Sequence, residues 1–256
     1  MIKKITVRFL GTGTSQGVPV IACPCAVCAS DDPHDKRLRC SVLIQAGEKN
    51  IVIDSGPDFR QQMLQAGVSR LDAILFTHGH KDHTAGLDDV RAYNYVMQCS
   101  MDVYAEKRVQ KDLRREFAYI FAENKYPGVP ELNIHTIDEM PFTIGAVQVI
   151  PVRAMHMKLP VLGFRIGQIA YLTDANSINK REKNKLRGLD CLIVNGLRKE
   201  PHVSHFALNE ALTLIEEMKP ARAYITHISH QMGFHSQVQS ELPPNVFLAF
   251  DGLEVC

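Results

Sequence analysis

The segment THGHKDH, residues 77–83, constrains this chain more than any other feature of its sequence. It lies where a short apolar run, which we predict as a buried strand, gives way to a helical pattern. Imidazole and carboxylate groups are ligands of zinc, manganese and iron. Four such groups on one ion would strain so tight a loop, whereas two ions explain the crowding. We therefore expect His78 and His80 to bind one metal ion. Asp82 and His83 can then turn toward a second.

Three more candidate ligands share one local form, an apolar strand with a ligand at its end. The strands predicted over residues 149–152, 169–173 and 223–226 lead to His156, Asp174 and His227. A lone histidine such as His156 is more often a surface residue than a ligand, and Asp174 could simply cap a helix. Their order and their strand-end positions nevertheless favour a common site, because each strand would deliver one rigidly held ligand to a shared rim.

The rest of the chain predicts sheets covered by helices. Short strand patterns alternate with helical ones, including a helix predicted over residues 84–97. No repeat, low-complexity tract or long linker interrupts them, so we predict one domain over residues 1–256. Such elements suit sheets packed on each other with helices outside. Gly11 and Gly13 follow a strand, but Gly17 has the wrong spacing for a dinucleotide-binding loop.

The overall charge points away from two classes of partner. Lys and Arg number 29 and Asp and Glu 28, so the formal net charge is +1. The net charge of the chain therefore provides no general attraction to nucleic acid or to an anionic membrane. No apolar run approaches the ~18–20 residues of a membrane span. Residues 1–8 lack the apolar core of a secretory signal, and we expect a cytoplasmic protein.

Taken in order, Asp54, residues 77–83, His156, Asp174 and His227 resemble the metallo-β-lactamase-fold hydrolases. The resemblance covers nearly the whole chain and implies an α/β (α+β) fold, the four-layer αββα sandwich. It also implies how the ligands are grouped: His78, His80 and His156 around one metal ion, Asp82, His83 and His227 around the other, and Asp174 as the bridge. By the same resemblance Asp54 is not a ligand, but braces the ligand loop through hydrogen bonds.

Three of the seven cysteines, Cys23, Cys25 and Cys28, lie within six positions. In a cytoplasmic chain this distribution indicates metal ligation rather than disulfides. Structural zinc prefers four Cys or His ligands. From the residues alone the fourth could be His34, Cys40 or a distant group.

Several segments resemble, more narrowly, the phosphoribosyl 1,2-cyclic phosphate phosphodiesterase group of the carbon–phosphorus lyase pathway. The shared segments are residues 11–13, 16–19, 23–28, 226–231 and 250–252. This resemblance implies one structural zinc bound by Cys23, Cys25, Cys28 and His230, beside two active-site metal ions, zinc or manganese. Such a zinc would clamp the zinc-binding loop at residues 23–28 to the loop that carries His227.

The expected chemistry follows from two metal ions with a shared oxygen ligand, which generate hydroxide near neutral pH. We predict a phosphodiesterase in which a metal-bridging hydroxide attacks a small phosphodiester, cyclic ones included. His205 matches a non-ligand histidine of the cyclic phosphodiesterases, and we assign it as phosphate stabiliser or general acid. Asp82 is counted with the catalytic residues as well as with the ligands. His202 fits a surface histidine better than a functional one.

Two alternatives stay open. The region of residues 105–132 has no clear match, and we interpret it as a lid over the metals or as a dimer contact, which leaves a homodimer open. A basic helix at its start fits a solvated face, but it keeps a nuclease of the transfer-RNA 3′-end processing type as one alternative. The other is a non-catalytic carrier, because residues 54–62 resemble the pyrroloquinoline quinone biosynthesis protein B group.

Overall fold

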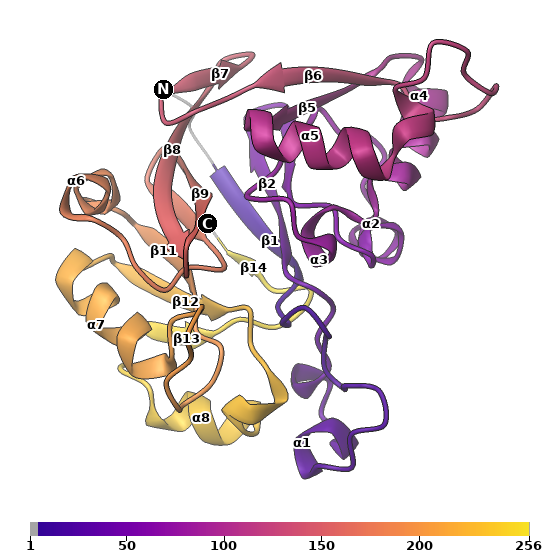
Figure 1. Ribbon diagram of the computed structural model, residues 1–256. Coiled ribbons are helices and arrows are strands. Elements are labelled where there is room, and N and C mark those ends of the chain that lie inside the picture. Colours follow the sequence, from indigo (N-terminus) through magenta and orange to yellow (C-terminus); the bar gives the residue numbers. More distant parts are fainter. Residues whose placement is uncertain (1–4, 256) are drawn as a thin grey trace.

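The structure, a computed structural model, describes residues 5–255; residues 1–4 and Cys256, which the predicted domain includes, lie outside this range. Two seven-stranded sheets pack face to face (Figure 1). The first has the order β14-β1-β2-β3-β4-β5-β6 and the second β13-β12-β11-β10-β9-β8-β7. The strands of the first sheet are β1 (Ile5–Gly11), β2 (Ser41–Ala46), β3 (Lys49–Ile53), β4 (Ala73–Leu75), β5 (Met101–Ala105), β6 (Leu132–Thr136) and β14 (Glu254–Val255). Those of the second are β7 (Phe142–Ile144), β8 (Val147–His156), β9 (Leu159–Ile166), β10 (Ile169–Leu172), β11 (Cys191–Asn195), β12 (Arg222–Thr226) and β13 (Val246–Leu248).

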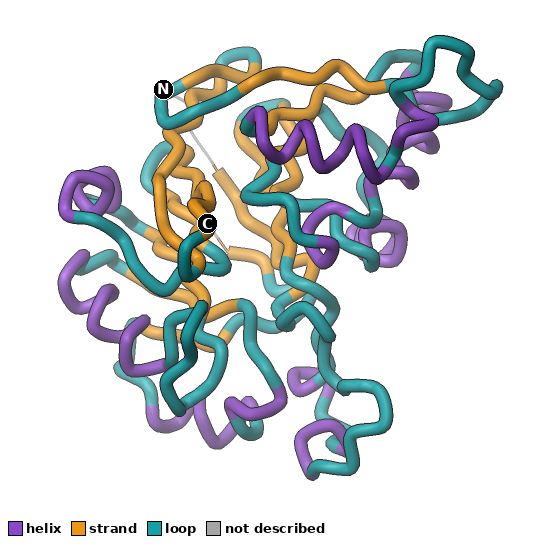
Figure 2. The backbone as a smooth tube through the Cα atoms, viewed as in Figure 1, coloured by secondary structure: helices purple, strands orange, loops and turns teal. Residues whose placement is uncertain are grey.

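Helices cover the outer face of each sheet, as Figures 1 and 2 show. The first sheet carries α2 (Phe59–Ala66), α3 (Lys81–Thr84), α4 (Arg91–Met97) and α5 (Lys107–Glu116), with the 3-10 turns η2 (Leu87–Val90) and η3 (Ala118–Ile120). The second carries α6 (Lys180–Lys183), α7 (Leu208–Met218) and α8 (His235–Glu241), with η4 (Asn184–Leu186) and η5 (His230–Met232). The short helix α1 (Ala26–Ala29) and η1 (Pro33–Asp35) lie in a loop that projects beyond the sheets.

Three separate apolar clusters fill the three interfaces of this sandwich. Ile51 and Ile53 of β3 point into the cluster between the two sheets, whereas Val52 points to the cluster under the helices of the first sheet. This alternation is the two-residue period of a strand that is buried on both faces. The predicted four-layer αββα sandwich is therefore confirmed.

One predicted element differs. The sequence pattern indicates a single helix over residues 84–97, but the chain there forms the end of α3, then η2, then α4. The break falls at Gly86, where a Cβ atom would lie only 2.1 Å from the carbonyl oxygen of Gly56. This close backbone approach bends the chain away from a straight helix.

Among the described residues, no helix is both long enough and apolar enough to cross a membrane.

Candidate metal centre

The predicted ligands leave the carboxyl ends of strands from both sheets. His78 follows β4, His156 is the last residue of β8, Asp174 follows β10, and His227 follows β12. Strands β10, β11 and β12 run parallel, and β8 has the same direction because β9 is antiparallel to both β8 and β10. Their carboxyl ends therefore meet at one edge, where the backbone N–H of Leu162 also donates to the carbonyl oxygen of Thr77 from the first sheet.

Asp174 lies at the centre of the cluster. Its Oδ1 atom is 3.0 Å from Nε2 of His227 and 3.4 Å from Nε2 of His83. Its Oδ2 atom is 3.7 Å from Nε2 of His78. One carboxylate therefore faces His83 and His227, predicted to bind one ion, and His78, predicted to bind the other. This is the position that a bridging ligand requires.

The possible donor atoms fall into three overlapping groups, each within 4.8 Å. The groups are Asp82, His83, Asp174 and His227; His78, His80 and Asp174; and His156, Asp174 and His205. All seven predicted ligands of the dinuclear site thus come together. His156 is grouped with His205 rather than with His78 and His80, although its ring centroid is only 5.2 Å from that of His80.

Several of these imidazole nitrogens have no hydrogen-bond partner. The Nε2 atoms of His78, His83 and His227 are buried and make no hydrogen bond, although carboxylate oxygens lie 3.0–3.7 Å from them. A buried polar atom without a partner is costly, and such atoms in a folded protein call for an explanation. Divalent cations would satisfy all three, and imidazole with carboxylate is a donor set that zinc and manganese accept. The residues therefore fit a pair of divalent ions.

The electrostatics of the cluster also favour cations. Burial alone would lower the pKa of His83, but the carboxylates of Asp174, Asp82 and Asp54 outweigh it and raise that pKa well above its ordinary value. Burial opposes ionisation of Asp174, yet His227 and His83 hold the pKa of its carboxyl well below the usual range. Three carboxylates thus share a largely buried space, where positive charge, carried by a protonated imidazole or by a metal ion, is strongly favoured.

Asp54 follows β3 and is completely buried beside the ligand loop. Its Oδ1 accepts a hydrogen bond from the Thr77 backbone N–H at 2.9 Å. Its Oδ2 accepts from the Thr77 hydroxyl at 2.8 Å and lies 2.7 Å from Nδ1 of His83. These contacts orient the His83 ring so that Nε2 faces the other ligands, which is the bracing role that the resemblance implies.

Three of the residues at these strand ends have strained backbones. Asp54, Asp174 and His227 have φ angles of +65°, +54° and +55°, a region that side chains other than glycine rarely adopt. Such outliers persist only where the surrounding structure enforces them, and they concentrate at functional sites. Here each left-handed residue ends a strand abruptly and turns its side chain toward the shared rim.

His205 lies between β11 and α7 and is almost fully buried. Its Nε2 is 3.4 Å from Oδ2 of Asp174, and its Nδ1 is 2.9 Å from the Ser204 hydroxyl and 3.2 Å from Nδ1 of His202. Burial lowers the pKa of His205 and favours the neutral ring. The structure thus places His205 in the cluster and His202 directly behind it.

The second cluster is formed by the three clustered cysteines and His230, the first residue of η5. Nδ1 of His230 is 3.3 Å from Sγ of Cys23 and 3.2 Å from Sγ of Cys25. The hydrogen bond to His230 contributes most to lowering the pKa of the Cys25 thiol to about 6. Burial raises the pKa of Cys28 to about 11.

The other two candidates for the fourth position lie elsewhere. Nδ1 of His34 is 2.9 Å from the Asp32 carboxylate, and the His34 ring stacks on His235. Cys40 is buried, with Sγ at 3.1 Å from the Tyr171 hydroxyl and 3.3 Å from that of Thr226. Of the named alternatives, only His230 joins the thiols.

Sequence reasoning missed the residues that hold the Asp174 turn. The side chain of Asn195 accepts from the backbone N–H of Ala175 at 2.8 Å and donates to its carbonyl at 3.0 Å. The Thr173 hydroxyl donates to Oδ1 of Asp174 at 2.8 Å. Asn195 is a polar residue at the end of the buried apolar strand β11. That position was the sequence signal that could have identified it.

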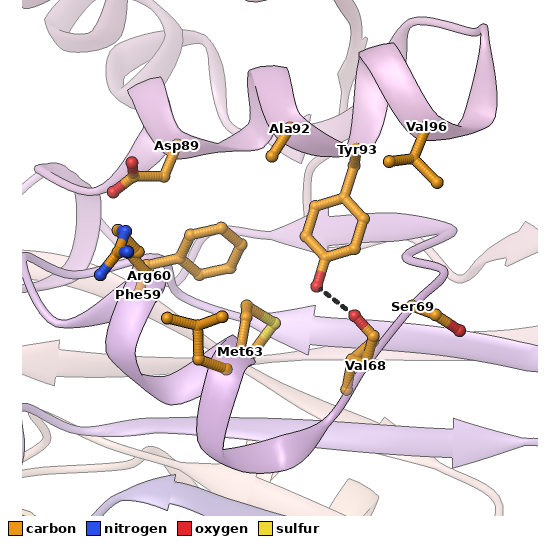
Figure 3. A pocket seen from close by; sticks show the side chains of 10 residues that line it. Phe59, Arg60, Met63, Val68, Ser69, Asp89, Ala92, Tyr93 and Val96 are labelled. Atoms are coloured by element: carbon orange, nitrogen blue, oxygen red, sulfur yellow. Dashed lines mark hydrogen bonds between the residues drawn. The ribbon is translucent and has the colours of Figure 1, made fainter.

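A separate apolar pocket of about 360 Å³ lies between α2 and α4 (Figure 3). Phe59, Met63 and Tyr93 line it, and the Tyr93 hydroxyl donates to the Val68 carbonyl at one side. No histidine or cysteine borders this pocket. Among the residues that the structure describes, the groups that could hold a metal ion lie instead at the strand ends and around the cysteine loop.

Comparison with known proteins gives one family. A model described as the β-lactamase superfamily domain matches residues 49–228. An octanoyltransferase of Porphyromonas gingivalis is 43% identical over 250 residues, which are 96% of this chain and 50% of that protein. The chain therefore spans about half the length of this curated relative.

Two solved structures resemble the fold over almost its whole length. A diphosphatase from the PhnP family has a TM-score of 0.92 and 40% identity, with coverage of 98% of this chain and 96% of that one. Zinc-bound PqqB from Methylobacterium extorquens has a TM-score of 0.80 and 18% identity, with coverage of 98% and 99%. At that identity, the second shows a common fold alone.

Proposed function

Because this chain belongs to the β-lactamase superfamily, we propose that it is a metal-dependent hydrolase that cleaves a small phosphodiester, cyclic ones included. The observation that carries the proposal is the position of Asp174, whose two carboxylate oxygens face His227 and His83 on one side and His78 on the other. The 40% identity to a PhnP-family diphosphatase supports phosphorus as the centre that is attacked.

The two metal ions would be held by the seven clustered side chains, with Asp174 common to both. When bound, divalent ions would supply an activated water molecule and neutralise charge on the phosphate. Asp54 fixes the His83 ring, and the strained strand ends keep the ligands in place before substrate arrives. These seven side chains would thus need little rearrangement during the reaction.

His205 is the residue that we assign to the phosphate or to the leaving group. It is not needed for the ligand sets that the resemblance implies, yet its Nε2 lies 3.4 Å from Asp174. An N–H at this position would donate to a phosphate oxygen in the neutral ring and, once the ring is protonated, would pass its proton to the departing alkoxide. The Ser204 hydroxyl and Nδ1 of His202 lie on the opposite side of the ring and orient it.

We also propose a structural zinc at Cys23, Cys25, Cys28 and His230. The four donor atoms lie within 4.8 Å of one another, and four Cys or His ligands complete a closed tetrahedral site. His230 follows His227 by three residues, so the ion would anchor the loop that delivers this ligand. The support comes from the donor set and its spacing.

The test is elemental analysis of the purified protein, followed by turnover assays with added manganese or zinc. The substrates are bis(p-nitrophenyl) phosphate, the 2′,3′-cyclic nucleotides, a precursor transfer RNA and an octanoyl thioester. We expect cleavage of the small diesters. Tight binding of another ligand without any turnover would favour a carrier, whereas preferential cleavage of the RNA or of the thioester would overturn the small-diester proposal.

A further inference from the structure

Two strongly exposed apolar side chains lie within two residues of histidines of the candidate metal centre. Met157 is 54% exposed and directly follows the predicted ligand His156. Val203 is 73% exposed and lies two residues before His205. Apolar side chains that the metal chemistry does not explain are thus exposed on the two turns that carry His156 and His205.

The side chain of Asn176 fixes these two residues next to each other. Its Oδ1 accepts a hydrogen bond from the Met157 backbone N–H at 3.0 Å, and its Nδ2 donates to the Val203 carbonyl at 2.8 Å. A third contact joins the same turns, because Nδ1 of His156 lies 2.8 Å from the Ser204 carbonyl oxygen. One amide group thus holds the two backbones together, two residues after Asp174.

The backbone of Met157 is also unusual. It has a φ angle of +56° at the turn between β8 and β9, where His156 pairs with Leu159. Two-residue turns of this kind favour glycine or asparagine, which adopt positive φ with little penalty. Methionine is a poor fit to this backbone conformation. Its presence here therefore points to a role for its side chain.

We propose that Met157 and Val203 form an apolar platform that binds the planar ring of the substrate, a nucleobase or an aryl group, beside the metal centre. The inference rests on the proposed function and narrows its substrate class. A methionine thioether contacts aromatic rings favourably, and an exposed valine adds apolar area beside it. The clustered side chains themselves are imidazoles and carboxylates, so ring and phosphate would be recognised by different surfaces.

The test compares two substrates that differ only in the ring. These are adenosine 2′,3′-cyclic phosphate and methyl ribofuranoside 2,3-cyclic phosphate, assayed with the metal-loaded protein. The variants are Met157→Asn, which retains a residue suited to the left-handed backbone, and Val203→Ser. Met140→Asn is the matched control, because Met140 is 67% exposed and lies just before β7, which pairs with the start of β8, whereas His156 is at the other end of that strand.

We expect each platform variant to lower the ratio of kcat/KM for the nucleotide over the ring-free diester about tenfold, mainly through KM. Met140→Asn should leave the ratio unchanged. If both platform variants leave this ratio unchanged, including by losing kcat/KM equally for the two substrates, the platform is overturned.

A binding measurement separates this inference from the proposed function. Calorimetry with adenosine 5′-monophosphate and ribose 5-phosphate needs no turnover, and we expect the wild type to prefer the nucleotide and the platform variants to lose that preference. If no diester is hydrolysed but this pattern holds, the proposed function fails and the platform stands. If diesters are hydrolysed without any preference for the ring, the platform fails alone.

Discussion

The two candidate metal clusters of this molecule are built in opposite ways. The His/Asp cluster takes its ligands from the ends of strands in both sheets, and most of its side chains are buried. The cysteine cluster takes three ligands from one projecting loop and the fourth, His230, from a position 202 residues after Cys28. The first depends on the whole sandwich, whereas the second depends on one long-range contact.

The two clusters also differ in their donor sets, and each set suits a different task. The His/Asp cluster has more donors than one ion needs, one carboxylate that belongs to all of its donor groups, and His205 beside that carboxylate, a set suited to a reactive centre. The cysteine cluster has four donors and no surplus, and a closed set of four is typical of structural zinc. The division is thus between a candidate reactive centre and a candidate anchor.

The largest effect is expected from Asp174→Ala. Removal of the shared carboxylate should abolish turnover of bis(p-nitrophenyl) phosphate and lower the metal content of the His/Asp cluster, because both ligand groups lose a member. Elemental analysis and kinetics measure the two effects. Asp190→Ala, at an exposed aspartate just before β11, is the control. Full metal content in the Asp174 variant would show that this residue does not bridge.

His205→Ala is expected to lower kcat by about 10²–10⁴-fold while the metal content stays intact. The reason is that His205 would act on the phosphate or the leaving group rather than hold an ion. His135→Ala, a half-exposed histidine on β6, serves as the control. A rate within a few-fold of the wild type removes His205 from the mechanism, and loss of metal from the variant makes it a ligand.

Cys28→Ser tests the anchor. We expect the loss of one zinc per chain and a Tm lower by roughly 5–10 °C, because the loop would no longer be tied to His230. The ions of the His/Asp cluster should remain, and turnover should fall less than tenfold. Cys99→Ser, at an exposed free thiol, should change neither metal content nor Tm. A Cys28 variant that keeps its full zinc content contradicts the assignment.

The smallest effect concerns pH and His235, the first residue of α8. Burial, together with the Arg37 guanidinium 3.1 Å away, lowers the pKa of His235 from 6.5 to about 4. The folded state therefore binds its proton more weakly than the unfolded state does, so stability should be complete above pH 6.5 and fall as the pH drops toward 4.

Urea unfolding at pH 7 and pH 5 measures this loss. After allowance for the partial exposure of His235, we expect its share to be on the order of 1 kcal/mol. His235→Asn should reduce the difference between the two pH values, whereas His135→Asn should not. An identical difference in the wild type and in His235→Asn would show that His235 does not titrate in this range.

Much of the site was readable from the sequence because its signals are local. Residues 77–83 crowd four donors into one loop, and an apolar strand leads toward or into each of His156, Asp174 and His227. The strand period and the hydrophobic runs likewise predicted the sheets. Each of these inferences uses neighbours within a few residues, where backbone geometry leaves few choices.

Local sequence patterns were therefore enough to predict which residues gather as candidate metal ligands, and that strands lead to most of them. The tertiary structure decided which residues meet across the chain: His156 beside His205, His230 rather than His34 or Cys40 at the thiols, and Asn176 between Met157 and Val203. It also decided the break at Gly86, which a distant backbone carbonyl imposes. Such contacts join residues tens to hundreds of positions apart, and they are set by how the two sheets pack, which no local period encodes.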